Sequence, residues 1–172
     1  MTRSIFAVTG SPGSGKTVYL AHVLNQLRSK SIRLAGVIQP REPHNGERDH
    51  YRLLNVKTGQ EIHFAQFING KCCFDCGGFE FASSAFLSAR NVQVLFADEL
   101  GNLEAQKQGH WPALEVALAQ NPNAILLCIL KKRHIETFKT LLPPFHLLDV
   151  EDPSANFNDF TQDLLNSLSS VP

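Results

Sequence analysis

The chain has 172 residues, of which 43% are hydrophobic and 19% charged, a composition that supports a folded core and argues against disorder. The length suits a single domain over residues 1–172. Sixteen Lys and Arg balance sixteen Asp and Glu, so no excess charge favours nucleic acid or an anionic membrane as a partner.

Taken in chain order, the sequence alternates between predicted strands and helices. Residues 1–8 lack a secretory signal, and no apolar stretch approaches the roughly 20 residues of a membrane span, so we expect a cytoplasmic protein. Hydrophobic periodicity and turn residues predict a strand at 5–9, a helix at 18–27, a strand at 34–38, a polar loop at 39–50, strands at 51–56, 61–67 and 71–74, a helix at 79–89, a strand at 92–97, a helix at 112–119, a strand at 124–130, a helix at 134–142, a strand at 145–150 and a C-terminal helix to about 168, capped by Ser154 or Asn156.

Two of these strands, at 51–56 and 61–67, flank a turn at 57–60 and predict an antiparallel β-hairpin insertion. The rest of the chain follows a β-α-β alternation, which is typical of parallel strands covered by helices. The predicted fold is therefore α/β: a three-layer α/β/α sandwich with a mostly parallel sheet and one hairpin insertion.

A phosphate-loop pattern follows the first strand. Gly10-Ser11-Pro12-Gly13-Ser14-Gly15-Lys16-Thr17 fits G-x-x-x-x-G-K-[ST], between a predicted strand and a predicted helix as the motif requires. Glycines let the backbone turn its N–H groups toward phosphate oxygens, and the helix adds its positive end. We expect the loop and Val18 to bind a nucleoside triphosphate, with Lys16 reaching the β- and γ-phosphates and the Thr17 hydroxyl ligating Mg²⁺. An ordinary Gly-rich turn is the alternative.

Two carboxylates, Asp98 and Glu99, follow the apolar strand at 92–97. Because the carboxyl ends of parallel strands meet at one edge of a sheet, we expect Asp98 beside the phosphate loop. In phosphate-loop proteins such an Asp holds Mg²⁺, and a neighbouring Glu polarises the attacking water. The pattern predicts Asp98 as a metal ligand and Glu99 as a catalytic residue, against the alternative of a solvated strand end.

The stretch Asp98-Glu99-Leu100-Gly101-Asn102-Leu103-Glu104 resembles the Asp-Glu-hydrophobic-Gly-x-hydrophobic-Glu signature of the small P-loop nucleoside-triphosphatases. Weaker similarity extends over roughly residues 4–140, including 36–42, 46–48 and 108–114. The resemblance implies a RecA-like or kinase-like α/β fold. It also implies Mg²⁺-dependent hydrolysis of nucleoside triphosphates to diphosphates, with broad base tolerance.

A further cation is expected, because phosphoryl transfer builds negative charge that an Arg often offsets. Arg41 and Arg48 lie on the loop at 39–50, and Arg48 is preferred because it matches the family position. Arg133, on a later loop at the same sheet edge, is a second candidate. Glu104 matches a family acid that either positions Arg or water or caps the local turn.

Three cysteines, Cys72, Cys73 and Cys76, invite a zinc interpretation. Zinc commonly takes four ligands from two spaced pairs, and the sequence has no second pair, so core or turn residues are the default. Departures from the family also occur here and at Asp49-His50-Tyr51, where the family has a Gly-aromatic pair after its Arg. Trp111 either stacks on a base or anchors a helix.

The preferred hypothesis is a Mg²⁺-dependent nucleoside-triphosphatase in which Lys16, Glu99 and Arg48 are catalytic and Thr17 and Asp98 bind the metal. One alternative is a kinase that transfers phosphate to a small molecule or nucleotide. The other is a nucleotide-dependent switch or accessory protein that acts on a partner. The sequence leaves base preference, oligomeric state and any protein partner open.

Overall fold

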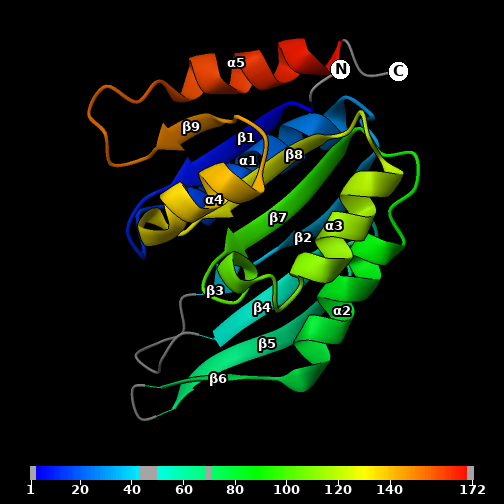
Figure 1. Ribbon diagram of the computed structural model, residues 1–172, viewed down its shortest axis with the longest axis vertical. Helices are drawn as coiled ribbons and strands as arrows, with labels where there is room; N and C mark the ends of the chain where they lie inside the picture. The colour runs from blue at the N-terminus through cyan, green and yellow to red at the C-terminus, as the bar shows by residue number, and fades with distance from the viewer. Residues whose placement is uncertain (1–2, 43–49, 69–70, 170–172) are drawn as a thin grey trace.

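The computed structural model describes residues 3–42, 50–68 and 71–169, which form a nine-stranded sheet flanked by helices (Figure 1). The strands are β1 (Ile5–Thr9), β2 (Leu34–Ile38), β3 (Arg41–Glu42), β4 (His50–Asn55), β5 (Glu61–Ile68), β6 (Lys71–Phe74), β7 (Val94–Leu100), β8 (Ile125–Leu130) and β9 (His146–Asp149). The helices are α1 (Lys16–Ser29), α2 (Cys76–Leu87), α3 (Trp111–Gln120), α4 (Ile135–Leu141) and α5 (Phe157–Leu168), with short 3₁₀ turns η1 (Glu104–Gln106) and η2 (Lys132–His134).

The sheet has a parallel half and an antiparallel half. Its strand order is β6-β5-β4-β2-β7-β8-β1-β9, with β3 paired to β4. Neighbouring strands from β2 to β9 in this order run parallel, whereas β4 pairs antiparallel with β2, β3 and β5, and β5 with β6. β8 lies between β1 and β7, so the strand that leads into the phosphate loop and the strand that contains Asp98 are not direct neighbours.

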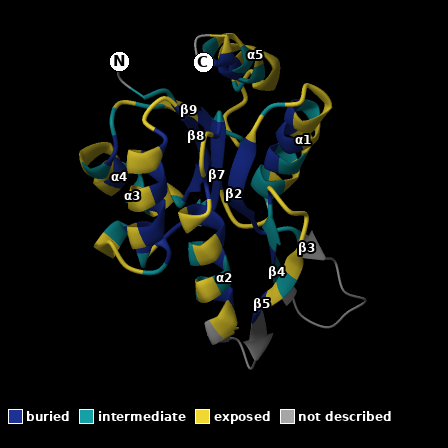
Figure 2. Cartoon of the chain, turned by 90° about the vertical axis from the view of Figure 1, so that its right-hand side faces the viewer, coloured by how far each residue is buried: buried dark blue, intermediate teal, exposed yellow. Residues whose placement is uncertain are grey.

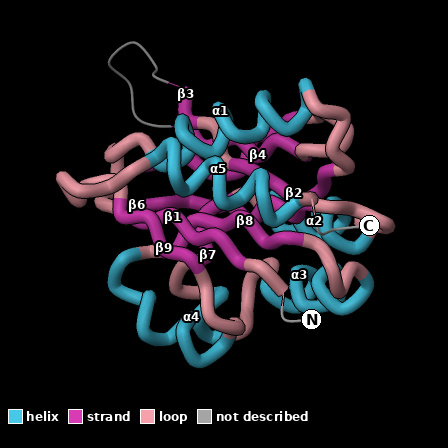
Figure 3. The backbone as a smooth tube through the Cα atoms, turned by 90° about the horizontal axis from the view of Figure 1, so that it is seen from above, coloured by secondary structure: helices cyan, strands magenta, loops and turns pink. Residues whose placement is uncertain are grey.

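Helices cover both faces of the sheet and give three layers. Figures 2 and 3 show α1 and α5 on one face and α3 and α4 on the other, with α2 beside α3. Alternate residues of one strand serve the two cores: in β8, Leu127 packs with the core under α1 and α5, whereas Leu126 packs with the core under α2, α3 and α4. No helix within the described ranges combines the length and the apolar character that crossing a membrane requires.

The structure confirms the α/β fold, with its mostly parallel sheet and hairpin insertion, that the sequence predicts. β1 and β2 have the predicted bounds, and β4 and β5 form the hairpin. Asn156 caps α5 by accepting hydrogen bonds from the N–H groups of Asn158 and Asp159, each at 3.1 Å.

Many boundaries differ from the prediction by one or two residues, and three differences are larger or bear on the site. The predicted loop at 39–50 contains β3, because Arg41 and Glu42 pair with β4. α2 begins at Cys76 rather than 79, since the Asp75 carboxylate accepts a hydrogen bond from the Gly77 N–H at 3.0 Å and caps the helix there. β7 continues beyond the predicted end at 97 to Leu100, so Asp98 and Glu99 lie within the strand.

Candidate functional site

The phosphate-loop sequence forms a tight turn between β1 and α1. Gly10 adopts a φ of +148°, and a Cβ there would lie 2.7 Å from both Ser14 Oγ and Val150 Cγ2, so only glycine fits. Gly15 adopts a φ of +91° at the N-cap of α1. Because glycine has no side chain, the N-cap does not compete with an anion for the first N–H groups of the helix. Val18, on this first turn, is 75% exposed.

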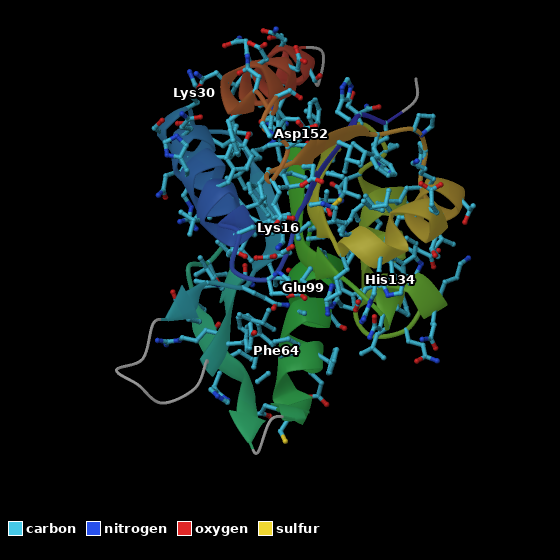
Figure 4. The ribbon with its side chains drawn as sticks, turned by 90° about the vertical axis from the view of Figure 1, so that its left-hand side faces the viewer. Lys16, Lys30, Phe64, Glu99, His134 and Asp152 are labelled. Atoms are coloured by element: carbon cyan, nitrogen blue, oxygen red, sulfur yellow. The ribbon has the colours of Figure 1, made fainter. Side chains whose placement is uncertain are left out.

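The Lys16 side chain folds back over the loop. Its ammonium donates hydrogen bonds to the carbonyl oxygens of Gly10, at 3.0 Å, and Ser11, at 2.6 Å. Partial burial lowers the pKa of Lys16, and the nearby carboxylates, chiefly Glu99 and Asp98, oppose that shift. Lys16 and the two acids of β7 are therefore electrostatic neighbours, and Figure 4 shows Lys16 and Glu99 at the same edge of the sheet.

Asp98 is buried at the carboxyl end of the parallel sheet. Its carboxylate accepts a hydrogen bond from the Gln39 N–H at 2.8 Å. Burial raises the pKa of Asp98 to about 7 and the negative charge of Glu99 adds to the rise, whereas the hydrogen bond from Gln39, the nearby Thr17 side chain and the charge of Lys16 oppose it. The structure thus brings together Thr17 and Asp98, the two predicted metal ligands, although β8 separates their strands.

Oxygen donors are the ligand type that Mg²⁺ prefers, and Mg²⁺ is commonly held by one or two carboxylates together with phosphate oxygens and water. A hydroxyl and a buried carboxyl that lie close together next to a phosphate loop fit such an ion. The raised pKa of Asp98 is also consistent with such an ion, because a cation beside the carboxylate would offset the cost of burying its charge.

Glu99 lies at an irregularity in β7. Ala97 pairs with Cys128 and Leu100 with Leu130, so β7 holds one more residue than β8 between these pairs. Glu99 adopts a φ of +60°, a left-handed conformation that costs about 1–2 kcal/mol for a residue with a side chain. The bulge directs the Glu99 carboxylate, which is 37% exposed, toward Lys131 Nζ at 3.0 Å.

The end of β9 adds charged residues that the sequence analysis did not select. The Glu151 carboxylate accepts hydrogen bonds from the Ser11 N–H, at 2.9 Å, and the Ser11 hydroxyl, at 3.0 Å. Lys132 bridges Asp149, at 2.8 Å, and Glu151, at 3.5 Å. The hydrogen bonds from Ser11 lower the pKa of Glu151, and the hydrogen bond from Lys132 lowers the pKa of Asp149. The sequence does predict a strand directly before Glu151. The pairing of that strand with β1, which brings the acids to the phosphate loop, cannot be predicted from the local sequence.

The predicted arginines are only partly placed. Arg48, the preferred catalytic cation, lies outside the described residues, as does the rest of 43–49. Arg41 lies in β3, where the backbone alone is described. The Arg133 guanidinium donates a hydrogen bond to the Asn102 side-chain oxygen, which also lies 2.6 Å from His134 Nε2. Arg133 is therefore tied to the turn after β7.

Glu104 caps that turn from inside. Its carboxylate is buried, accepts a hydrogen bond from the Gly101 N–H at 3.0 Å and lies 3.3 Å from His110 Nδ1. Burial lowers the pKa of His110, and the nearby Glu104 carboxylate opposes that shift. Of the two interpretations of Glu104, the turn cap is the one that these contacts support.

The cysteines and Trp111 lie away from this edge. Cys73 is exposed on β6, and the side chains of Cys72 and Cys76 are outside the described set. Within the described ranges, no three His, Cys, Asp or Glu side chains are grouped so as to hold a metal ion. Trp111 is buried and packs against Phe138, with ring centroids 6.0 Å apart, so it anchors α3 in the core rather than facing a ligand.

Comparisons with known proteins identify relatives of the chain. The sequence is 31% identical over 111 residues to a protein named nucleoside-triphosphatase THEP1 from Caldivirga maquilingensis, covering 60% of this chain and 62% of that protein. The chain thus spans less than two thirds of that relative's length. It is 23% identical over 145 residues to the THEP1 protein of Pyrococcus abyssi, covering 79% of each.

The fold matches the solution structure of a human cancer-related nucleoside triphosphatase with a TM-score of 0.72, over 99% of this chain and 100% of that one. At 21% sequence identity, this likeness shows the fold alone. The sequence matches the NTPase family over residues 5–153, which spans the phosphate loop, the carboxylates that end β7 and the charged end of β9. The chain therefore belongs to the NTPase family.

Proposed function

We propose that the protein hydrolyses nucleoside triphosphates, ATP and GTP among them, to the diphosphate and phosphate in a Mg²⁺-dependent reaction. One observation carries the proposal: the Thr17 side chain, at the end of the phosphate loop, lies beside the buried Asp98, and Glu99 follows Asp98 directly. The loop that would bind phosphate, the two residues that would bind the metal and the candidate base would then lie at one edge of the sheet.

The residues of this edge would divide the work between them. The loop N–H groups from Gly10 to Val18 and the Lys16 ammonium would hold the β- and γ-phosphates and offset their charge. Mg²⁺, held by the Thr17 hydroxyl and, through water, by Asp98, would neutralise charge on the same phosphates. Arg48 remains the proposed additional cation, on the strength of the family resemblance.

Glu99 is the proposed base. Its carboxylate would accept a proton from water as the water oxygen bonds to the γ-phosphorus, while the bond from that phosphorus to the β,γ-bridging oxygen breaks and releases the diphosphate. Its left-handed backbone is consistent with this role, because strained residues often occur where a side chain must point at a reacting group.

Phosphate release from ATP, GTP, CTP and UTP, with Mg²⁺ and with EDTA, tests the proposal. Lys16→Ala and Glu99→Gln should each lower the rate by about 100-fold or more, and EDTA should abolish it. Lys30→Ala, directly after α1, and Glu136→Gln, on α4, are matched controls at exposed positions and should retain the wild-type rate.

Equal phosphate release by wild type, Lys16→Ala and Glu99→Gln would contradict hydrolysis at this site. Formation of a phosphorylated small molecule or nucleotide faster than free phosphate would instead indicate a kinase. Tight nucleotide binding with negligible turnover until a partner protein is added would indicate a switch.

A further inference from the structure

The residue that follows β8, Lys131, reaches back to the proposed base. Its N–H donates a hydrogen bond to the Leu100 carbonyl oxygen at 3.1 Å, which continues the pairing of β8 with β7 beyond the bulge. Its ammonium lies 3.0 Å from Glu99 Oε1. Because β8 lies between β1 and β7, this cation is fixed between the strand of the phosphate loop and the strand of the acids.

The path of the Lys131 side chain depends on Gly101. A Cβ at Gly101 would lie 3.2 Å from Lys131 Cδ and 3.4 Å from both Cε and Nζ, so the stem of Lys131 lies across the glycine. The Gly101 N–H is in turn held by the buried Glu104 carboxylate at 3.0 Å. The surface over which Lys131 extends is therefore itself anchored in the core.

The other cations of this loop have different partners. Lys132 pairs with Asp149 at 2.8 Å, and Arg133 donates to Asn102. Of these three consecutive basic residues, Lys131 alone is the one that the described contacts direct to Glu99. A surface ion pair by itself adds little stability, so the value of this contact lies in the direction that it gives to the carboxylate.

We propose that Lys131 is a positioning residue that holds the Glu99 carboxylate in place to activate water. The role rests on the proposed function of Glu99. The bulge turns the Glu99 backbone, but the long side chain keeps several rotamers, and Lys131 restricts them from one side. Misplacement of a catalytic group by about 1 Å can cost as much as 100-fold in rate.

Steady-state phosphate release by Lys131→Met, Lys131→Arg and Lys139→Met tests the role. Lys131→Met keeps a stem over Gly101 but removes the charge, and should lower kcat about 10- to 100-fold while KM changes less than about 3-fold. Lys131→Arg keeps the charge and should recover most of the rate. Lys139→Met breaks an exposed ion pair, with Glu136 at 2.7 Å, and should match wild type.

Gly101→Ala gives a second, independent variant. Its methyl group would press on the Lys131 stem, so kcat should fall by less than in Lys131→Met. If both substitutions act through one contact, the double variant should be no slower than Lys131→Met alone. Circular dichroism and the thermal midpoint of each variant separate a loss of rate from a loss of fold.

The outcomes distinguish this role from the proposed function. No phosphate release by wild type would contradict the hydrolase proposal itself. Normal release that Glu99→Gln abolishes but Lys131→Met leaves unchanged would overturn the role of Lys131 alone. A loss in Lys131→Met that appears in KM rather than kcat would also overturn it, since that residue would then act in nucleotide binding.

Discussion

At the scale of single residues, the buried carboxyl of Asp98 couples stability to pH. Its pKa is raised from 3.8 to about 7 by burial, so between these values the folded protein holds a proton that the unfolded chain releases. The contribution of Asp98 to stability is therefore fully present below pH 3.8 and is lost as the pH rises through 7. Ionised Asp98 therefore lowers the free energy of unfolding at pH 8.

Asp98→Asn should accordingly make the nucleotide-free protein more stable at pH 8 and inactive. Asn removes the charge, and its oxygen still accepts the Gln39 N–H, so the free energy of unfolding should rise by about 2–4 kcal/mol at pH 8 and change little at pH 4. Urea unfolding across this pH range measures the effect. An equal change at both pH values would contradict the assignment to Asp98.

Glu99→Gly should relieve backbone strain. Glycine adopts a φ of +60° without the penalty that glutamate has, so the free energy of unfolding should rise by about 1 kcal/mol, whereas hydrolysis should be lost. Glu99→Gln is the control, because it removes the charge but keeps the strain, and its stability should match wild type. Equal stability of the two variants in thermal unfolding would show that Glu99 is not strained.

At the scale of elements, the turn from Gly101 to His110 links β7 to α3 through Glu104. Gly109 adopts a φ of +62°, and a Cβ there would lie 2.3 Å from Glu104 Oε1, so Gly109→Ala would force the carboxylate away from His110 and Gly101. Gly59→Ala is the matched control: its φ is +74°, but a Cβ would meet nothing within 4 Å.

Both glycine substitutions should be destabilising, but by different amounts. Gly59→Ala should cost about 1 kcal/mol for the backbone alone, and Gly109→Ala a further 1–3 kcal/mol because buried polar groups of the turn lose their partners. Gly109→Ala should also lower the phosphate-release rate, since the turn supports the surface under Lys131. Denaturant unfolding of the two variants, together with their rates, checks this; equal costs would mean that the turn repacks freely.

How far the elements could be predicted depended on how local their causes are. β1 and β2 are continuous apolar runs between polar turns, and their bounds follow from the sequence alone. β3 consists of two polar residues that form a strand only because β4 lies beside them. The continuation of β7 to Leu100 likewise depends on Leu130, in a strand about 30 residues later. The strand propensity of the local sequence therefore predicts neither β3 nor the end of β7.

The site divides in the same way. The phosphate loop and the acids of β7 are contiguous motifs, so they could be selected from the sequence. The contacts of Ser11 with Glu151 and of Glu99 with Lys131 join residues that are 140 and 32 positions apart. Only the strand order, with β8 inserted between β1 and β7 and β9 at the far side of β1, brings these residues to one edge.

At the scale of the whole molecule, the same strand order couples the two cores. Neighbouring residues of β8, such as Leu126 and Leu127, face opposite cores, and β1 alternates in the same manner. Neither core can lose its packing while the central strands stay ordered for the other. We therefore propose that the described residues form a single domain that unfolds cooperatively.

A core substitution on one face should then shift the unfolding of both. Leu24, in α1, and Leu114, in α3, are buried in different cores, and either Leu→Ala change should cost about 2–5 kcal/mol. Trp111, the single tryptophan, lies in the core that contains Leu114. Leu24→Ala should nevertheless lower the Trp111 fluorescence midpoint as much as the circular dichroism midpoint, whereas Val116→Ala, at an exposed site, should change neither. A fluorescence midpoint that stays at the wild-type value in Leu24→Ala would mean that the two faces of the sheet unfold separately.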